Sequence, residues 1–295
     1  MTKTSQTSRV RFALAGPSEN LDPRINAYRA DIADMALAGR IFAHYYAHPS
    51  VRQCIVPHAP LHEGPDREST MTSELLFGEG FAVIDRTKDW VWGFCTHDHY
   101  VGYLPADAIG EADAPDHIVV VAKTAAHLSP DMTADTHAAL TMGARLSGSA
   151  SGNWLETSLG FVPLADLAAL ETTESDPVTV AEQLIETPYL WGGRGAAGID
   201  CSGLVQIALG LFGTEAPRDS DMQMASLGEP LADDAVLKRG DIVFFPDHVG
   251  WMADPETLLH AAHHHGKVVY EPLEDVVARI GQEHDRPVLA RKRLV

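Results

Sequence analysis

The sequence predicts an α+β protein in which two small β-barrels precede a mixed domain. Three observations predict this organisation. The segment GYLPADAI, which starts at Gly102, resembles GFVPLADL, which starts at Gly160, and a repeat of about 58 residues suits two small barrels. An apolar helical pattern follows Cys201, and short strand patterns fill residues 241–270. A chain of 295 residues has room for two or three such domains.

The first part of the chain is expected to be a structural clamp. After a polar start, the run LDPRINAYRADIADMALAGRIF predicts a helix from about Ile32, with Leu21, Ile25 and Tyr28 anchoring the segment on the barrels. No motif here indicates chemistry.

Both barrels are expected to follow this leading segment. Each copy of the repeat is preceded by a strand pattern that contains tryptophan, at Trp90 and Trp92 or at Trp154. Chance similarity between two short motifs is the alternative. The expected boundaries are 1–48 for the leading segment, 49–113 and 114–172 for the barrels, and 173–295 for the mixed domain.

The helix of the mixed domain begins with a thiol. The run Gly198-Ile199-Asp200-Cys201-Ser202-Gly203 leads from a polar turn into apolar positions at three- and four-residue steps, which Gly213 ends. Asp200 is the natural N-cap. Free N–H groups and the helix dipole favour a thiolate, so we expect the pKa of Cys201 to be lowered. A small core residue is the alternative for this motif alone.

A base for this thiol is expected on the strands that follow. A thiol nucleophile needs an imidazole within hydrogen-bond reach and a polar group that orients the imidazole. If the hairpin turns near Asp254, then His248 and His260 stand equally far from the turn and face one another, about 5 Å apart at Cβ. The alternative for either histidine alone is a structural role.

Four segments together resemble the NlpC-type family of cysteine peptidases: PYLWGGRGAAGIDCSGL, PRDSDMQ, RGDIVFF and DHVGWMADPETLLHAA. The resemblance covers roughly residues 177–295 and implies a compact papain-like fold. It implies Cys201 as the nucleophile, His248 as the base and His260 as the third polar residue. Both copies of the repeat are similar to the bacterial SH3-like domains found ahead of such catalytic domains.

Within that family, the resemblance is to γ-D-glutamyl-L-diamino-acid endopeptidases, which recognise a free amino terminus. It implies six substrate-binding residues: Tyr100, Tyr189, Asp200, Ser202, Asp219 and Ser220. A carboxylate beside the nucleophile suits an ammonium group, because charge-assisted hydrogen bonds are strong. An acidic residue of the first barrel, Glu74 or Glu79, is expected to help. The alternatives are a helix cap, core aromatics, loop caps and solvated strand-end charges.

Composition favours the cytoplasm. Residues 1–20 contain no apolar core long enough for an export signal, and no later stretch could span a membrane. The three cysteines are widely spaced and offer no framework of disulfides. With 41 acidic and 22 basic residues, the net charge of −19 argues against nucleic acid as a partner. Small murein peptides released from the cell wall are the substrate that we expect, and the oligomeric state stays open.

Other constellations are weaker. The cluster of His260, His263, His264 and His265 is rich in metal-ligand side chains, but consecutive residues on a strand point to opposite faces. A rival dyad in FCTHDHY, where Cys95 would share a face with His97 and His99, lacks a helix start. The glycine-rich WGGRGAAG lacks the Lys-Ser/Thr ending of a phosphate loop.

The sequence therefore predicts a cysteine endopeptidase that cleaves the bond between γ-D-Glu and the diamino acid in free murein peptides, without a metal or organic cofactor. An amidase or acyltransferase on the same fold is one alternative. A wall-ligand binding protein with a vestigial third domain is the other.

Overall fold

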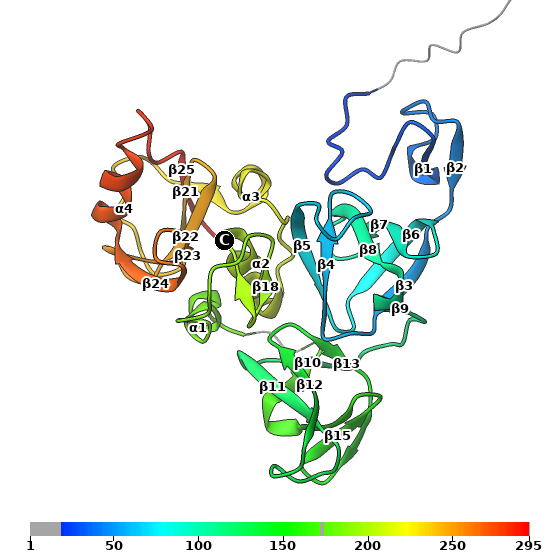
Figure 1. Ribbon diagram of the computed structural model, residues 1–295. Coiled ribbons are helices and arrows are strands. Elements are labelled where there is room, and N and C mark those ends of the chain that lie inside the picture. The colour runs from blue at the N-terminus through cyan, green and yellow to red at the C-terminus, as the bar shows by residue number, and fades with distance from the viewer. Residues whose placement is uncertain (1–18, 172–173, 295) are drawn as a thin grey trace, which may run out of the picture.

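Three β-rich parts pack around helix α2 (Cys201–Phe212) in the computed structural model, which describes residues 19–171 and 174–294 (Figure 1). The mixed domain lies beside the first barrel, and the second barrel lies below both in this view. Residues 1–18 and 172–173 include the start of the leading segment and the expected end of the second barrel. They lie outside the described residues, and the predicted domain boundaries stay predictions.

The leading segment forms two short strands rather than the helix expected from Ile32, so that prediction is wrong. Its elements are β1 (Ile32–Asp34), the 3-10 turn η1 (Met35–Leu37) and β2 (Tyr45–Ala47), with β1 and β2 paired in parallel. The Asp34 side chain caps the 3-10 turn. Gly39, with φ of 86°, then reverses the chain before a longer helix can form.

The segment is attached to the first barrel by residues other than the expected anchors. Leu21 and Tyr28 pack within the leading segment, and Ile25 is exposed. The anchors are instead Ile32, which packs near Trp92, and Arg29, whose guanidinium lies 4.4 Å from the centre of the Trp92 ring. A cation over an aromatic face is attracted by the ring electrons, so this contact holds the clamp.

The first barrel is a seven-stranded antiparallel sheet in the order β5-β4-β8-β7-β6-β3-β9. Its elements are β3 (Ser50–Cys54), β4 (His58–His62), β5 (Met71–Leu76), β6 (Gly80–Arg86), β7 (Trp90–Cys95), β8 (Val101–Pro105), η2 (Ala106–Ala108) and β9 (Ile109–Gly110). Alternating residues such as Leu61, Phe81 and Leu104 fill its core.

The second barrel has its own core, in which Leu140 and Leu155 are buried. Its elements are β10 (His117–Val119), β11 (Lys123–His127), β12 (Thr136–Thr141), β13 (Arg145–Leu146), β14 (Ser149–Ser151), β15 (Trp154–Thr157), β16 (Gly160–Pro163), η3 (Leu164–Asp166) and β17 (Leu167–Ala169). The two copies of the repeat adopt the same structure. In each, a Trp-bearing strand pairs with a strand that ends in a 3-10 turn.

The mixed domain is built on a six-stranded sheet in the order β20-β25-β21-β22-β23-β24. The strands of this sheet are β20 (Glu229–Pro230), β21 (Asp241–Phe245), β22 (His248–Met252), β23 (Thr257–Ala262), β24 (Lys267–Pro272) and β25 (Ala290–Arg293). A separate two-stranded sheet is formed by β18 (Arg194–Gly195) and β19 (Gly198–Ile199). Its helices are α1 (Pro177–Glu182), α2, α3 (Ser220–Ser226) and α4 (Leu273–Ile280). One face of the sheet packs against α1 and α2, and the other packs against α4.

Helix α2 begins and ends where the sequence predicts. The Asp200 side chain accepts a hydrogen bond from the Gly203 N–H at 2.7 Å, and Gly213 ends the helix with φ of 85°. The helix is buried almost all round because the sheet covers one side and both barrels reach the other. Leu76 of the first barrel and Ile118 and Met142 of the second are the buried barrel residues that join this core. Helix α2 is therefore held by all three parts of the chain.

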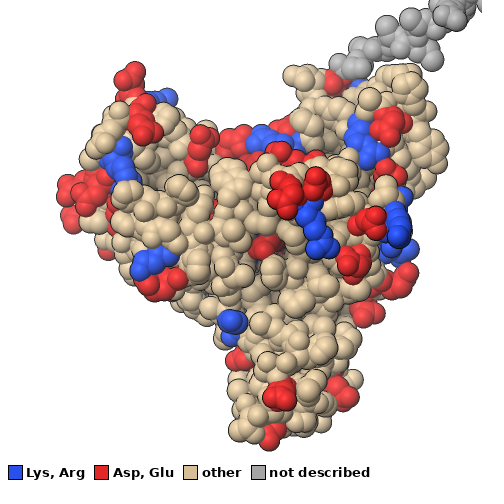
Figure 2. All heavy atoms as spheres, in the orientation of Figure 1, with Lys and Arg blue, Asp and Glu red and all other residues tan. Residues whose placement is uncertain are grey.

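Acidic side chains are spread over the face drawn in Figure 2, and basic side chains stand beside them singly or in pairs. No continuous positive patch is visible on this face. None of the helices described for this chain is long and apolar enough to cross a membrane.

Candidate active site

Cys201 lies at the start of α2 and lines a pocket of about 460 Å³ between the mixed domain and the first barrel. Cys201 is 6% exposed. The backbone N–H groups of Ser202 and Val249 face the sulfur, so the thiol lies between α2 and β22, the strand that begins at His248. The fold thus holds this thiol at the end of a helix and opens it to a pocket.

The pKa of Cys201 is raised, and the expected lowering is wrong. Burial raises the pKa most, and the neighbouring Asp200 carboxylate adds to the rise, so the pKa reaches about 12. The N–H groups that face the sulfur favour the thiolate but are outweighed. The resting thiol is therefore protonated at neutral pH, and a base must remove its proton before it can attack.

The predicted contact between the two histidines is confirmed, although its register differs from the prediction. His248 Nε2 lies 2.7 Å from His260 Nδ1. Trp251 pairs with Leu259, which centres the hairpin one residue beyond Asp254 and makes the histidines diagonal neighbours. The same register places Gly250 opposite His260, where a Cβ would come within 3.0 Å of the His260 Cβ. A glycine there leaves the space in which the two rings meet.

A carboxylate that the sequence analysis missed continues this chain of contacts. Glu271 Oε2 lies 3.1 Å from His260 Nε2, on the face of the sheet that α4 covers. Arg279 of α4 forms a bidentate ion pair with the same carboxylate, and His265 Nε2 lies 3.2 Å from it. The alternation of β24 was the available signal, because Glu271 stands two residues from Val269, the direct partner of His260.

Both histidines are neutral at physiological pH. Burial, and after it the neighbouring His260, lower the pKa of His248 to about 3. Burial also lowers the pKa of His260, to about 4, although Glu271 opposes that effect. Burial raises the pKa of Glu271, but Arg279 outweighs it and holds the pKa at about 2. The carboxylate is thus charged while both rings keep a single proton.

Five of the six predicted substrate residues line the pocket with Cys201: Tyr100, Asp200, Ser202, Asp219 and Ser220. The exception is Tyr189, which lies outside the lining and packs edge-on against His263, with 5.2 Å between ring centres. Sequence analysis missed other lining residues, chiefly the exposed Trp191 and the acidic Glu63 of the first barrel.

One wall of the pocket is shared between the barrel and the mixed domain. The Tyr100 hydroxyl lies 3.0 Å from Asp219 Oδ2, and Arg24 Nη1 donates to the same oxygen at 2.8 Å. Burial raises the pKa of Asp219, and burial together with Asp219 raises the pKa of Tyr100. Arg24 comes from the leading segment, for which no chemistry was predicted. The clamp therefore reaches the pocket itself.

Asp200 lines the pocket, but its oxygens are already engaged. Arg218 Nη2 donates to Asp200 Oδ2 at 2.6 Å, and its Nη1 donates to Oδ1 at 2.9 Å. Gly192 and Gly203 donate backbone N–H groups to the same carboxylate. Since a carboxylate offers about four lone-pair sites, Asp200 has little capacity left for a ligand. It holds the loop, the helix start and Arg218 together.

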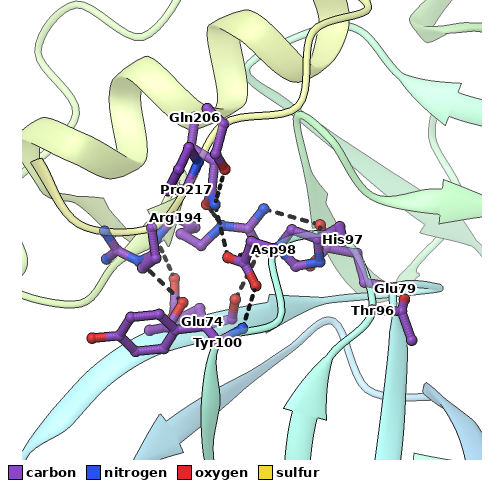
Figure 3. Close-up of polar contacts among 12 residues, drawn as sticks. Glu74, Glu79, Thr96, His97, Asp98, Tyr100, Arg194, Gln206 and Pro217 are labelled. Atoms are coloured by element: carbon purple, nitrogen blue, oxygen red, sulfur yellow. Dashed lines mark hydrogen bonds and ion pairs between the residues drawn. The ribbon is translucent and has the colours of Figure 1, made fainter. Parts of the chain in front are cut away.

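Glu74 and Glu79 do not lie in the pocket, so the expectation that one of them reaches a ligand there is wrong. Both are buried under the loop that precedes Cys201, where they hold Arg194 (Figure 3). Glu79 pairs with both terminal nitrogens of Arg194, at 2.7 and 3.0 Å, and Glu74 accepts from its backbone N–H at 2.8 Å. The acidic residue of the first barrel that does line the pocket is Glu63.

Asp98 extends this buried network into α2. It accepts from Gln206 Nε2 at 2.8 Å, and Gln206 Oε1 accepts from Arg194 Nε at 2.5 Å (Figure 3). The network therefore joins the first barrel to the helix that carries Cys201. It also explains how a loop with several glycines keeps one position.

The rival constellations do not form sites in the described part of the chain. Cys95 is fully buried in the barrel core, and burial raises its pKa. His97 and His99 lie beyond the end of its strand, in a turn that His99 enters with φ of 61°. No group of three His, Cys, Asp or Glu side chains among residues 19–171 and 174–294 is arranged to hold a metal ion.

Two segments of the chain match known protein families. Residues 61–109 match the bacterial dipeptidyl-peptidase Sh3 domain, and residues 186–279 match the NlpC/P60 family. Dipeptidyl-peptidase 6 of Lysinibacillus sphaericus is 25% identical over 236 residues, which cover 69% of this chain and 84% of that protein. The gamma-D-glutamyl-L-lysine dipeptidyl-peptidase of Bacillus cereus (strain ATCC 10987 / NRS 248) is 24% identical over 206 residues, or 61% of each chain.

The fold is similar to that of a crystal structure of an NlpC/P60 family protein from Bacillus cereus ATCC 10987. The TM-score is 0.70 at 17% sequence identity, and the match covers 83% of this chain and 99% of that chain. The predicted α+β fold, with an SH3-like domain ahead of the mixed domain, is confirmed.

Proposed function

We propose that this chain, a cysteine peptidase with an SH3-like domain and an NlpC/P60 domain, cleaves the bond between γ-D-glutamate and the diamino acid in murein peptides with a free L-Ala amino end. One observation carries the choice of substrate. The pocket that contains Cys201 is walled by Tyr100 of the first barrel, hydrogen-bonded to Asp219.

The charges around the pocket support a cationic group in the substrate. Five carboxylates and two guanidinium groups line it. One guanidinium, that of Arg218, is already paired with Asp200. The other, that of Arg24, pairs with Asp219 and Asp221. Asp219, which also accepts from Tyr100, and Glu63 are the carboxylates with which an ammonium group would form charge-assisted hydrogen bonds. A substrate whose chain continued beyond its amino end would meet the barrel, which favours a short peptide over intact wall.

The proposed reaction starts from a neutral thiol and a neutral imidazole. His248 takes the proton of Cys201 as the sulfur attacks the γ-carbonyl carbon, and backbone N–H groups at the start of α2 stabilise the oxyanion. The imidazolium then gives its proton to the leaving amine of the diamino acid. Water hydrolyses the thioester, releases L-Ala-D-Glu and restores the thiol. His260 keeps the His248 ring oriented throughout.

The proposed setting is the recycling of released murein fragments in the cytoplasm. All three cysteines, Cys54, Cys95 and Cys201, are free and buried, which suits a reducing compartment. The similarity to a protein of Bacillus cereus that is named gamma-D-glutamyl-L-lysine dipeptidyl-peptidase supports a γ-D-glutamyl substrate.

Mass spectrometry of two reactions tests the proposal. The purified protein is incubated with L-Ala-γ-D-Glu-diaminopimelate and, separately, with the N-acetylated peptide. We expect L-Ala-D-Glu only from the free peptide, because acetylation removes the ammonium charge. Equal cleavage of both would favour an amidase or acyltransferase, which has no need of a free amine. Cleavage of neither, together with binding, would favour a wall-ligand binding protein.

Replacing Asp219 with asparagine is expected to lower kcat/KM for the free peptide about 10- to 100-fold, mainly through KM. A hydrogen bond to a charged group contributes about 1.5–3 kcal/mol, and each 1.4 kcal/mol is a factor of about ten. Steady-state kinetics with the free peptide measure the change.

Asp221→Asn is the matched control, because Asp221 lines the same pocket but its side chain is 60% exposed and pairs with Arg24. Its effect should be smaller. If Asp219 binds the ammonium group, D219N should lower kcat/KM for the free peptide but should have little further effect on kcat/KM for the acetylated peptide. Full additivity of the substitution and the acetylation would place the ammonium group elsewhere.

A further inference from the structure

We propose that Glu271 is a positioning residue that sets the proton positions on both histidines and so leaves His248 Nδ1 free to accept the proton of Cys201. This inference rests on the proposed function in one respect, since it assigns a base to the same reaction. It adds a fourth member behind Cys201, His248 and His260. Glu271 does not line the pocket, so it acts only through the histidines.

The first step is the direction of each hydrogen bond. An ionised carboxylate can only accept, so His260 must donate from Nε2 to Glu271. A neutral His260 with its proton on Nε2 has a bare Nδ1, which must accept. His248 therefore donates from Nε2 to His260 across 2.7 Å. A neutral His248 with that proton in place has a lone pair on Nδ1, as a general base requires.

The second step is what keeps Glu271 ionised. Arg279 of α4 pairs with both of its oxygens, and His265, in the turn between β23 and β24, lies 3.2 Å from Oε2. Asp275 is the other charged group near Arg279. His260 of β23 contacts Glu271, and His248 of β22 lies on the far side of His260. The carboxylate is thus the fixed anion at the end of the row that His248 and His260 form.

The third step is what happens without that anion. Either of two adjacent neutral histidines can donate the hydrogen bond between them, so the pair alone does not determine which ring is the donor. In the reversed direction, His260 donates from Nδ1 to His248 Nε2, and the proton of His248 moves to Nδ1. Such a ring cannot accept a proton from the thiol. The anion decides between an active and an inactive arrangement of the same two side chains.

Glu271→Gln is expected to reverse the direction of the hydrogen bonds from His248 through His260 to residue 271. Arg279 has only donors, so it claims the amide oxygen and turns the amide NH₂ toward His260 Nε2. We expect kcat to fall by up to about 10⁴-fold, the loss expected when a catalytic imidazole is held in the wrong tautomer, with KM unchanged. Glu274→Gln is the matched control, because Glu274 is an exposed glutamate of α4, and it should leave both constants unchanged.

Nitrogen-15 NMR of the imidazole side chains reads the proton positions directly. In the wild type, His248 and His260, assigned with H248Q and H260Q, should both carry the proton on Nε2. In E271Q both should carry it on Nδ1. Arg279→Gln keeps the carboxylate, so it should keep the Nε2 protons, and it serves as the second variant if E271Q folds poorly. Wild-type rings with Nδ1 protons, or unchanged protons in E271Q, would overturn the inference.

The pH profile of kcat gives a second readout with opposite signs. Glu271 raises the pKa of His248, and Arg279 lowers it. The acidic limb of the profile, where kcat falls because His248 becomes protonated, should therefore move to lower pH in E271Q and to higher pH in R279Q. Shifts of the same sign in both variants would contradict the inference. The NMR experiment needs no turnover, so a wild type that fails to cleave the peptide sinks the proposed function and leaves this inference to be decided by the spectra.

Discussion

Hydrolysis of the free murein peptide is expected to fall by about 10⁴-fold or more in kcat when Cys201 is replaced by alanine. The sulfur forms the thioester, and the other described thiols, those of Cys54 and Cys95, are buried in the core of the first barrel. The pocket loses only a sulfur atom, so peptide binding should persist. Mass spectrometry of the products and isothermal titration calorimetry of the variant measure the two effects.

Cys95→Ala is the matched control for C201A. It removes the sulfur of a second buried cysteine, one that does not itself line the pocket, so kcat should not change. A thiol-reactive probe should label the wild type at Cys201 and leave C201A unlabelled. Turnover by C201A at the wild-type rate would show that the thiol is not the nucleophile.

The free energy of unfolding is expected to drop by about 3–5 kcal/mol when Glu79 is replaced by alanine. Glu79 and Arg194 are both 3% exposed, and the variant would leave the guanidinium buried beside one fewer carboxylate. Breaking a buried pair costs far more than breaking an exposed one, because the remaining charge keeps its desolvation penalty. Urea denaturation measures the loss.

Glu111→Ala is the control for E79A. Glu111 pairs with Arg52 at 2.9 Å, but its side chain is 89% exposed, so its loss should cost at most about 1 kcal/mol. A loss in E79A no larger than that in E111A would mean that the buried network does not stabilise the fold.

The deficit of E79A should also depend on pH. Burial raises the pKa of Glu79, but Arg194 outweighs it and holds the pKa at about 2. A lowered pKa in the folded state gives stability that is present above the unfolded value, about 4.3, and is lost as the pH falls through the folded value. The difference between the wild type and E79A should therefore shrink between about pH 4.3 and pH 2.

Local patterns in the sequence predicted those parts of the site that lie near one another in the chain. The cap by Asp200, the length of α2 and the contact between His248 and His260 follow from helix and hairpin geometry. The hairpin register was displaced because strand alternation fixes which face a residue occupies more firmly than it fixes the centre of a turn.

Contacts between distant segments could not be predicted in this way. Arg24 reaches Asp219 across 195 residues of chain, and Arg194 reaches Glu79 across 115. Both depend on how the parts dock. The prediction of a lowered pKa for Cys201 was wrong for a related reason. A helix start favours a thiolate, but burial by neighbouring segments is the larger effect, and a single sequence does not reveal it.

The ion network around Arg194 also bears on how such proteins can be recombined. A gene fusion that exchanged the first barrel for another would separate Arg194 from the carboxylates that neutralise it. An incoming barrel would have to bring acids at the positions of Glu74 and Glu79 to support the loop before Cys201. The first barrel and the peptidase domain should therefore be transferred together when chimeras are built from this chain.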